Sequence, residues 1–386
     1  MPQWTLRLAA GEHCRVECPV KVKVGAVTAK PASLMLTETA TGRAVPCQGG
    51  VDGEGNLWVH WIVDALRAGA TREYRLETGD EPEPWPGVLV VDRDGRMEVQ
   101  IADRFFTAYN YGSQWVKPFL WPVVGPYDDH ITRDYPMIPD VPGEKHDHHH
   151  QKSLYTAHGS VNGVDDWSEE TGHGSVVHRG FAQLVSGPVL GVIQADNDWV
   201  SKDGEKVMSE QRTMVFYNLP GPEKIVDYTV HFKADAGPVT FGDTKEGGIL
   251  AVRVATTMDE NSGLGGKIEN AYGGVSEKEN WGKKAPWCDY SGPVKDRFVG
   301  ITIMDHLDNP RYPTEYHVRA YGLMTANPFA WHDYKADPTL DGSLTVPAGE
   351  DLIFRYRLYI HRGDAKVGKV GERYHDFINP PTVQVV

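Results

Sequence analysis

Short stretches in which apolar and polar residues alternate, each closed by turn-forming residues, run through most of this chain. The alternation is clear in residues 15–24 and 57–63, where successive side chains fall on opposite faces of an extended strand. Gly and Pro, at 41 and 26 of the 386 residues, supply turns between these stretches and interrupt long helices. The pattern therefore predicts a mainly β fold of many short antiparallel strands, with one short helical segment at 369–378.

Two strand-rich parts are separated by an acidic, proline-rich segment. Strand patterns occupy residues 3–78 and resume at Val88, whereas residues 78–87 contain three prolines and three acidic residues. Such a segment sustains neither a helix nor a central strand. We therefore expect a small N-terminal β-sandwich at residues 1–77, a linker at 78–87, and a large antiparallel β-sandwich of the supersandwich type at 88–386.

The charge and the apolar pattern exclude several classes of partner. The formal net charge of −14 repels phosphate backbones and anionic lipid surfaces, so we expect neither nucleic acid nor a membrane as a partner. No apolar run approaches the ~20 residues of a membrane span, and the first residues lack the pattern of a signal peptide, which predicts a cytoplasmic or leader-trimmed protein. The cysteines, at 14, 18, 47 and 288, are expected to be reduced structural thiols.

Residues 117–180 are irregular, and they hold a histidine cluster. Seven of the 16 histidines lie between His146 and His178. If residues 146–150 are extended, His146, His148 and His150 share one face and form a possible ligand set for a divalent metal. Two other interpretations stay open: a metal-free site in which histidines transfer protons, because their pKa lies near neutrality, and a solvated polar turn.

A second group of polar and aromatic residues lies near the ends of later predicted strands. Such groups bind sugars because aromatic side chains stack on the sugar ring and polar side chains form hydrogen bonds with its hydroxyl groups. Arg133 binds a carboxylate or a hydroxyl pair in one interpretation and pairs with Asp134 or Asp128 in the other. The expected substrate-binding residues are Arg133, Asn162, Trp167, Trp287, Tyr290, His317 and Arg319.

Several motifs together resemble a bacterial domain family labelled PmoA, or methane oxygenase, over roughly residues 90–380. They are Thr132-Arg-Asp-Tyr-Pro136, Asp147-His-His-His-Gln-Lys-Ser-Leu154, His158-Gly-Ser-Val-Asn-Gly-Val-Asp165, Trp287-Cys-Asp-Tyr-Ser-Gly292, Met304-Asp-His306 through Arg311-Tyr-Pro-Thr314, and Asn327-Pro-Phe329.

The resemblance implies a role in bacterial carbohydrate utilisation, with a sugar or sugar derivative as substrate. The central run of the family is Asp-His-Pro-His-His-Arg, so this chain has His149 in place of Pro and Gln151 in place of the second paired His. That departure favours His148 and His150 as the retained functional groups. The membrane monooxygenase that the label evokes needs transmembrane helices, which are not visible in this sequence.

The leading hypothesis is a carbohydrate-active enzyme, a hydrolase or a lyase, that acts on a glycoside or an oxidised sugar derivative by histidine-based acid and base catalysis. The expected catalytic residues are His148, His150, His158, Asp305 and His306. For a mechanism with two carboxylates, the candidates are Asp147, Asp165, Asp289 and Asp305. The alternatives are a non-catalytic sugar-binding protein with Trp121, Trp167 and Trp287 as stacking platforms, and a metal-dependent oxygenase.

Overall fold

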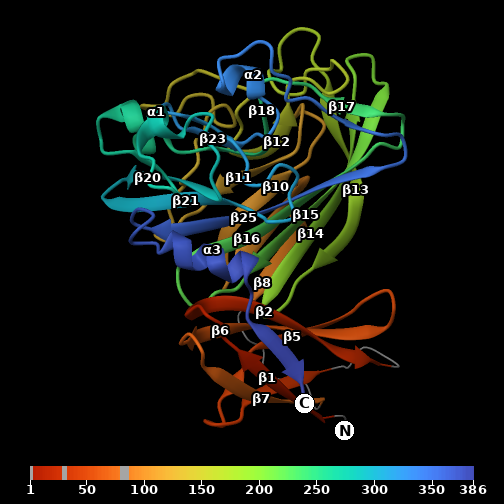
Figure 1. Ribbon diagram of the computed structural model, residues 1–386, viewed down its shortest axis with the longest axis vertical. Coiled ribbons are helices and arrows are strands. Elements are labelled where there is room, and N and C mark those ends of the chain that lie inside the picture. Colours follow the sequence, from red (N-terminus) through yellow and green to blue (C-terminus); the bar gives the residue numbers. More distant parts are fainter. Residues whose placement is uncertain (1–2, 28–32, 79–86) are drawn as a thin grey trace.

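The computed structural model describes residues 3–27, 33–78 and 87–386. These residues form five antiparallel sheets arranged as a small N-terminal unit below a large sandwich (Figure 1). The mainly β fold predicted from the alternating pattern is thereby confirmed. Most of the predicted linker, residues 79–86, lies outside the described residues, and the domain boundaries stay a prediction.

Two sheets make the N-terminal unit. Sheet III has the order β26-β1-β7-β3-β4 and sheet IV the order β2-β6-β5. Apolar side chains that alternate along the strands fill the space between the two sheets, and Leu6, Trp61 and Leu76 are completely buried there. The strands are β1 (Gln3–Ala9), β2 (Arg15–Ala26), β3 (Leu34–Glu38), β4 (Ala44–Val45), β5 (Cys47–Val51), β6 (Asn56–Leu66), β7 (Thr71–Thr78) and β26 (Thr382–Val385).

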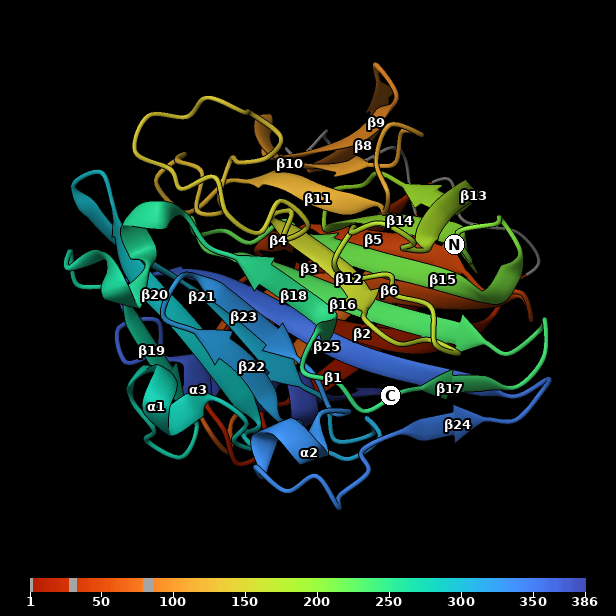
Figure 2. The same cartoon turned by 90° about the horizontal axis from the view of Figure 1, so that it is seen from above.

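Two eight-stranded sheets form the large sandwich, and Figure 2 shows them stacked, with β11, β12, β18 and β23 lying over β16 and β25. Sheet I has the order β22-β23-β18-β12-β11-β10-β9-β8. Its strands are β8 (Val88–Arg93), β9 (Arg96–Ile101), β10 (Arg104–Asn110), β11 (Phe119–Val123), β12 (Leu154–His158), β18 (Gly247–Arg253), β22 (Tyr316–Arg319) and β23 (Leu323–Ala326).

Sheet II has the order β13-β14-β15-β16-β25-β21-β20-β19. Its strands are β13 (Ser175–Val185), β14 (Leu190–Val200), β15 (Lys206–Tyr217), β16 (Lys224–Lys233), β19 (Lys267–Asn270), β20 (Trp287–Val294), β21 (Arg297–Asp305) and β25 (Asp351–Arg362). A small ribbon of β17 (Val239–Phe241) and β24 (Leu344–Val346) lies at the end of the sandwich. The main hydrophobic core fills the space between sheets I and II, so each sheet has an inner face on this core and an outer face away from it.

The helices are few and short. They are α1 (Ser276–Asn280), α2 (Trp331–Tyr334) and α3 (Val370–Ile378), together with the 3₁₀ turns η1 (Thr256–Met258) and η2 (Glu260–Ser262). The predicted helical segment at 369–378 is confirmed by α3. Among the described residues no helix is both long and apolar enough to cross a membrane.

The end of the chain returns to the N-terminal unit. Strand β26 pairs with β1, and Arg15 of β2 forms a buried ion pair with Asp376 of α3, with a distance of 3.0 Å between Nη1 and Oδ1. Sheet IV therefore faces the outer face of sheet II, and sheet I carries its own outer face on the opposite side of the molecule (Figure 1).

Candidate functional site on the outer face of sheet I

The histidine run at 146–150 is an irregular loop and not a strand. Each of its rings has a different neighbour: His146 stacks on Tyr135 with 4.8 Å between ring centroids, and His148 stacks on Tyr321 at 4.7 Å. His150 lies 5.8 Å from the ring of Trp167. The extended segment that would align three imidazoles is absent, and no group of three His, Cys, Asp or Glu side chains suited to a metal occurs within the described part of the chain.

Below this loop, strand register brings distant residues into two rows on the outer face of sheet I. In the first row Arg253 of β18 lies opposite Leu323 of β23, which lies opposite Arg319 of β22. The second row consists, in order across four strands, of Tyr155, Ala251, Thr325 and His317. Directly opposed residues project from the same face of a sheet, so both rows point toward the loop that carries His148 and His150. We call these two rows the polar face.

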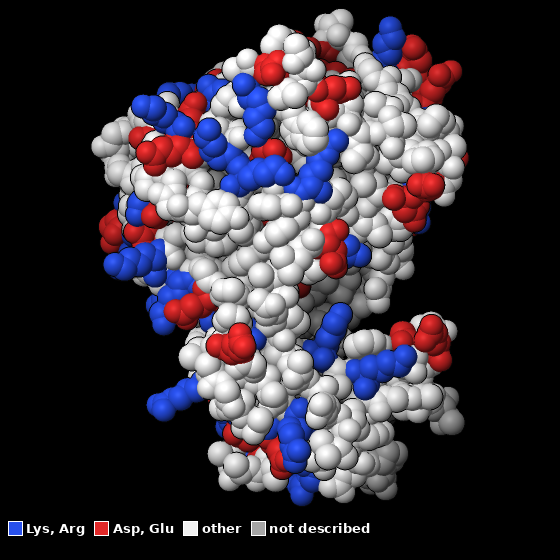
Figure 3. Space-filling model, in the orientation of Figure 1, with Lys and Arg blue, Asp and Glu red and all other residues white. Residues whose placement is uncertain are grey.

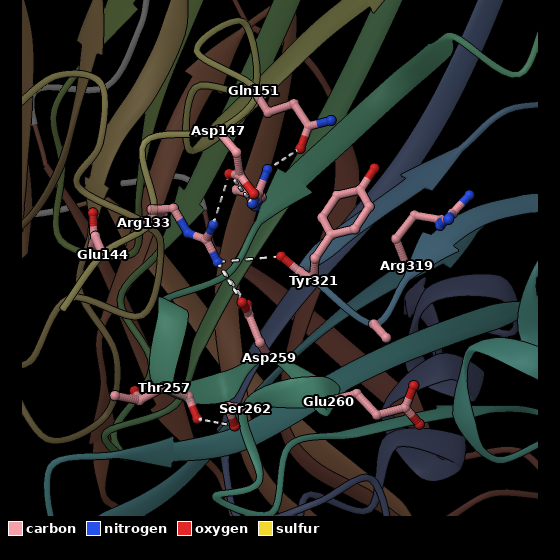
Figure 4. A network of polar contacts seen from close by, with 12 residues as sticks. Arg133, Glu144, Asp147, Gln151, Thr257, Asp259, Glu260, Ser262, Arg319 and Tyr321 are labelled. Atoms are coloured by element: carbon pink, nitrogen blue, oxygen red, sulfur yellow. Dashed lines mark hydrogen bonds and ion pairs between the residues drawn. The ribbon is translucent and has the colours of Figure 1, made fainter.

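Two buried arginines, Arg133 and Arg253, hold the loop, and Figure 4 shows Arg133 between Asp147 and Asp259. Both guanidinium groups are almost fully buried, with 1% of each side chain exposed. Arg133 forks onto Asp259 through Nη2, at 2.7 and 2.9 Å from the two carboxylate oxygens. Arg253 Nη2 donates to Asp147 Oδ1 at 2.8 Å, and Arg133 Nη1 reaches the same oxygen at 3.4 Å. The interpretation that paired Arg133 with Asp134 or Asp128 is therefore wrong.

These two arginines stabilise the negative charge of Asp147. Burial alone would raise the pKa of Asp147, but Arg253 and Arg133 outweigh it and lower the pKa below its ordinary value. His148, the next residue, has its Nδ1 3.5 Å from Asp147 Oδ2. Asp147 is thus an ionised group that orients both the loop and the His148 ring.

Tyr321 provides the surface against which His148 stacks. Its ring lies below two cations, with the guanidinium carbons of Arg253 and Arg319 at 4.9 and 5.5 Å from the ring centroid. Cation–π attraction of this kind fixes a ring in place. Burial raises the pKa of Tyr321, so the phenol stays protonated near neutral pH. The His148 ring is therefore presented in one orientation, with about a third of its side chain exposed to solvent.

His150 has a different environment from His148. Burial, followed by the nearby charges of Lys117 and His148, lowers the pKa of His150 to about 3. Lys117 and Lys152 both bind the carboxylate of Glu169, with Lys117 Nζ 2.7 Å from Oε1. His150 is consequently neutral at physiological pH, with one ring nitrogen able to accept a proton or a hydrogen bond.

Several buried polar groups of this region have no protein partner. Within the described residues, the hydroxyl of Tyr155, the indole nitrogen of Trp167 and Nε2 of His317 make no hydrogen bond. Unsatisfied buried groups are rare in proteins and call for an explanation such as a bound molecule. Tyr155 and His317 end the second row of the polar face, about 14 Å apart if neighbouring strands are ~4.8 Å apart. Both residues are almost fully buried, with 0% of Tyr155 and 2% of His317 exposed.

The other residues proposed as catalytic lie elsewhere. His158 points to the inner face, where its Nε2 lies 2.9 Å from the Gly242 carbonyl oxygen and burial lowers its pKa to about 4. Asp305 accepts hydrogen bonds from Asn309 Nδ2 at 2.7 Å and from the Thr314 amide at 2.8 Å, and burial raises its pKa to about 7. His306 packs against α3, so these three residues do not join His148.

The proposed substrate-binding residues divide in the same way. Trp167, His317 and Arg319 border the polar face, whereas Asn162 ties its turn to the backbone of Pro238 and Thr240. Trp287 packs in the small apolar cluster beneath α3.

Tyr290 lies below the turn that follows β22. Its hydroxyl is 3.2 Å from the carbonyl oxygens of both Arg319 and Ala320, and it accepts a hydrogen bond from the Glu260 amide. It therefore positions Arg319 and does not face the ligand itself.

The carboxylates proposed for a two-acid mechanism are not brought together. Asp165 binds backbone amides of its own turn, Asp289 pairs with His361 at 2.9 Å, and Asp305 holds the loop described above. Only Asp147 borders the polar face, and its charge is paired with arginines. Proton transfer at this site would thus fall to imidazoles.

Sequence reasoning missed Arg253 and Asp259. Arg253 ends a strand, Gly247–Arg253, in which every residue is buried. A guanidinium at the end of an otherwise apolar strand is a signal that was available, because a buried charge requires a partner. Asp259 lies in a turn and carries no comparable signal.

The chain is similar to a number of solved structures, two of which are described here, and it matches no curated protein. One is a protein in the glycosyl hydrolase family 38 from Enterococcus faecalis, with a TM-score of 0.46, 12% identity, and coverage of 100% of this chain and 47% of that one. The other is an alpha-mannosidase from Enterococcus faecalis V583, with a TM-score of 0.48, 11% identity, and coverage of 100% and 46%. The chain spans about half the length of these two proteins.

The PmoA label suggested by the motifs is not the label of the family whose model matches the chain. The motifs themselves, between Thr132 and Phe329, all fall inside the matched segment. That model describes a family of unknown function and covers residues 96–375, and the protein therefore belongs to the family DUF6807.

Proposed function

We propose that the protein is a carbohydrate-active enzyme that acts on a glycoside or an oxidised sugar derivative at the polar face, with His148 and His150 as the proton-transfer groups. The observation that carries the proposal is the set of unpartnered polar groups of Tyr155, Trp167 and His317 beneath the two histidines. The resemblance of the histidine-rich motifs to the family labelled PmoA supports the same class of substrate.

The substrate would lie between the histidine loop and the polar face. Arg319, which is one-third exposed, offers a fork of donors for vicinal hydroxyls or a carbonyl oxygen, and Trp167 offers an indole donor beside its ring. The buried guanidinium of Arg253 is already paired with Asp147, so its role in this proposal is to hold the histidine loop above the site. Binding of the substrate would satisfy the groups that lack partners.

The two histidines have distinct roles in this proposal. His150 keeps a ring nitrogen free over the whole physiological range, because burial lowers its pKa to about 3. Such an imidazole is a weak base, so in this proposal it accepts the substrate proton only when negative charge on the bound substrate raises that pKa. His148 is more exposed and lies beside the Asp147 carboxylate, so it exchanges its proton with the leaving group or with solvent. A hydrolase would add water to the sugar–oxygen bond that breaks, whereas a lyase would remove a proton from carbon and expel the same oxygen without water.

The test uses the purified protein, a panel of glycosides and their oxidised derivatives, and mass spectrometry of the products. A hydrolase product gains the mass of one water, and a lyase product is unsaturated. We expect His148→Ala and His150→Ala to lower kcat by at least about 100-fold, the size typical of a lost acid or base.

His231→Ala is the matched control, because the His231 imidazole lies 2.6 Å from the Asp351 carboxylate at the surface of sheet II, and it should retain activity. No turnover across the panel, with sugar binding retained, would contradict the proposal and support the non-catalytic binding protein. Loss of activity on dialysis against a chelator, restored by iron or copper, would support the oxygenase alternative instead.

A further inference from the structure

A large cavity in the described part of the protein lies on the opposite side of the sandwich from the polar face. It has a volume of about 890 Å³ and lies between sheet IV and the outer face of sheet II. Figure 3 shows the molecule hollowed between the N-terminal unit and the sandwich, with lysine and arginine side chains at the edge of the hollow. Its volume falls in the upper part of the range for ligand sites, roughly 300–1,000 Å³. We call this cavity the inter-sheet cleft.

We infer that the inter-sheet cleft is a second binding site, which takes an extended oligosaccharide that carries carboxylate groups. The inference does not rest on the proposed function, because the cleft shares no residue with the polar face. His306, expected from the sequence to be catalytic, lines this cleft instead.

A row of hydrogen-bonding side chains crosses the floor of the cleft. Register places Gln183, Gln194, Thr213, Thr229 and Arg355 opposite one another on five neighbouring strands of sheet II. Neighbouring strands lie ~4.8 Å apart, a spacing comparable with the length of one pyranose ring. Gln183, Thr229 and Arg355 of this row line the cleft, whereas Gln194 donates to Gln211 and Thr213 within the sheet. The cleft thus offers an amide, a hydroxyl and a guanidinium group to a sugar chain that runs across the strands.

The facing wall, sheet IV, supplies an aromatic surface. Trp58 is half-buried, and its indole nitrogen donates to Asp52 Oδ2 at 2.9 Å. Lys21 Nζ lies 5.5 Å from the centroid of the Trp58 ring. A tryptophan held in this way loses little entropy on binding and can stack on the apolar face of a sugar.

The charges that line the cleft favour an acidic ligand. Its two carboxylates are already paired: Asp227 Oδ1 accepts from Arg357 at 2.6 Å, and Asp376 is bound by Arg15. Lys21 and Arg355, by contrast, form no ion pair with any described residue. In a protein of net charge −14, two unpaired cations in one cleft are positioned to bind carboxylates.

The two walls are fixed relative to each other. Gln48 of sheet IV accepts hydrogen bonds from the amides of Val189 and Leu190, at 3.0 and 2.9 Å, and the Arg15–Asp376 pair joins β2 to α3. The cleft is therefore preformed, so a ligand does not have to order it.

Isothermal titration of the full chain with galacturonic acid oligomers, and with neutral glucose oligomers of the same length, tests the inference. We expect the acidic oligomer to bind at least tenfold more tightly. Lys21→Ala, Arg355→Ala and Trp58→Ala should each weaken its binding by about tenfold or more. Lys23→Ala is the matched control, because Lys23 lies on the same strand and already pairs with Glu54, and it should change the affinity by less than twofold.

The binding should also survive in the His148→Ala variant, which separates this site from the polar face. Equal affinity for neutral and acidic oligomers, or no binding of either, would overturn the inference. So would binding that is lost in His148→Ala and retained in Lys21→Ala. Melting temperatures of all variants identify any loss that arises from unfolding.

Discussion

At the scale of single residues, burial decides what each charge at the polar face does. Arg133 and Asp259 are both 1% exposed and form a forked pair, while Arg253 shares the partly exposed Asp147. A buried pair contributes modestly to stability when intact, but the loss of one partner leaves an uncompensated charge in a medium that solvates it poorly. The loop of His148 therefore depends on the full set of partners.

The first prediction compares two Arg–Asp pairs with the same 2.7 Å separation. Asp259→Asn removes the partner of buried Arg133 and should lower the free energy of unfolding by about 3–5 kcal/mol. Arg104→Gln breaks the pair with Asp128, in which both side chains are more than half exposed, and should change it by less than about 1 kcal/mol. Urea unfolding measures both, and equal effects would show that burial does not set the strength of these pairs.

The second prediction concerns acid. Burial lowers the pKa of His158 to about 4, whereas an unfolded histidine titrates near 6.5. Between these values the unfolded chain binds a proton that the native chain does not, so His158 makes the protein lose stability as pH falls from 6.5 toward 4.

His158→Gln keeps a donor for the Gly242 carbonyl oxygen but does not titrate. We expect the difference in unfolding free energy between the natural protein and this variant to shrink by about 1–2 kcal/mol from pH 7 to pH 5. Urea unfolding at the two pH values checks this, and a difference that stays constant would mean that His158 is not held neutral.

His148 and His150 could be found from the sequence because a run of histidines is conspicuous in composition. Arg253 and Asp259 could not be paired with the loop, since they lie more than 100 residues from Asp147 and Arg133 along the chain. His158 was misassigned because its strand, β12, alternates: Tyr155 and Ala157 point outward, and His158 points to the core. Sequence spacing identifies the faces of a strand, but not which face is covered by which loop.

At the scale of secondary-structure elements, antiparallel register assembles the polar face. Strands β12, β18, β23 and β22 are far apart in sequence, yet they are neighbours in sheet I. Strand β12 lies in the segment 117–180 that the sequence described as irregular, so that description is wrong for residues 154–158. A pattern of period two also contains no information about which strand pairs with which. The sequence alone therefore could not predict that Tyr155, Arg253 and His317 lie on one face of the same sheet.

The third prediction concerns the turn between β22 and β23. The Tyr290 hydroxyl lies against the carbonyl oxygens of Arg319 and Ala320, and its loss should let Arg319 shift. Tyr290→Phe is expected to raise the KM for the sugar substrate about tenfold, with a cost of about 1 kcal/mol in stability for one lost hydrogen bond.

Tyr316→Phe is the control for this prediction. It removes a buried hydroxyl that donates to the Ile303 carbonyl oxygen, on the inner side of the same strand. It should show the same loss of stability with an unchanged KM. If both variants alter KM equally, the effect arises from general loosening of β22, and Tyr290 has no positioning role.

At the scale of the whole molecule, the chain closes on itself. Strand β26 adds to the edge of sheet III beside β1, and α3 packs on β2 through the Arg15–Asp376 pair. The sequence pattern predicted a separate N-terminal sandwich at residues 1–77, but it contained no sign that the last strand completes this unit. The four residues Thr382–Val385 are too few for a sequence pattern to predict a strand. They form a strand because they pair with the edge of β1.

The fourth prediction follows from this closure. Because β26 and the Arg15–Asp376 pair tie the N-terminal unit to the sandwich, the intact chain should unfold in one calorimetric transition. A chain that ends at Asn379 lacks β26 and exposes the edge of β1, so its N-terminal unit should melt first, in a separate transition several degrees lower. Each lost kcal/mol lowers the melting temperature of a unit of this size by roughly 4–8 °C. Hydrogen exchange assigns the lower transition, with early exchange expected in β1 and β7.

A chain that lacks only Val386, which donates one backbone hydrogen bond to Thr5, is the control and should keep the single transition. If the chain ending at Asn379 also melts in one step at the original temperature, β26 contributes nothing to the union of the two parts. The packing of α3 on β2 and the hydrogen bonds of Gln48 to Val189 and Leu190 must then hold them together.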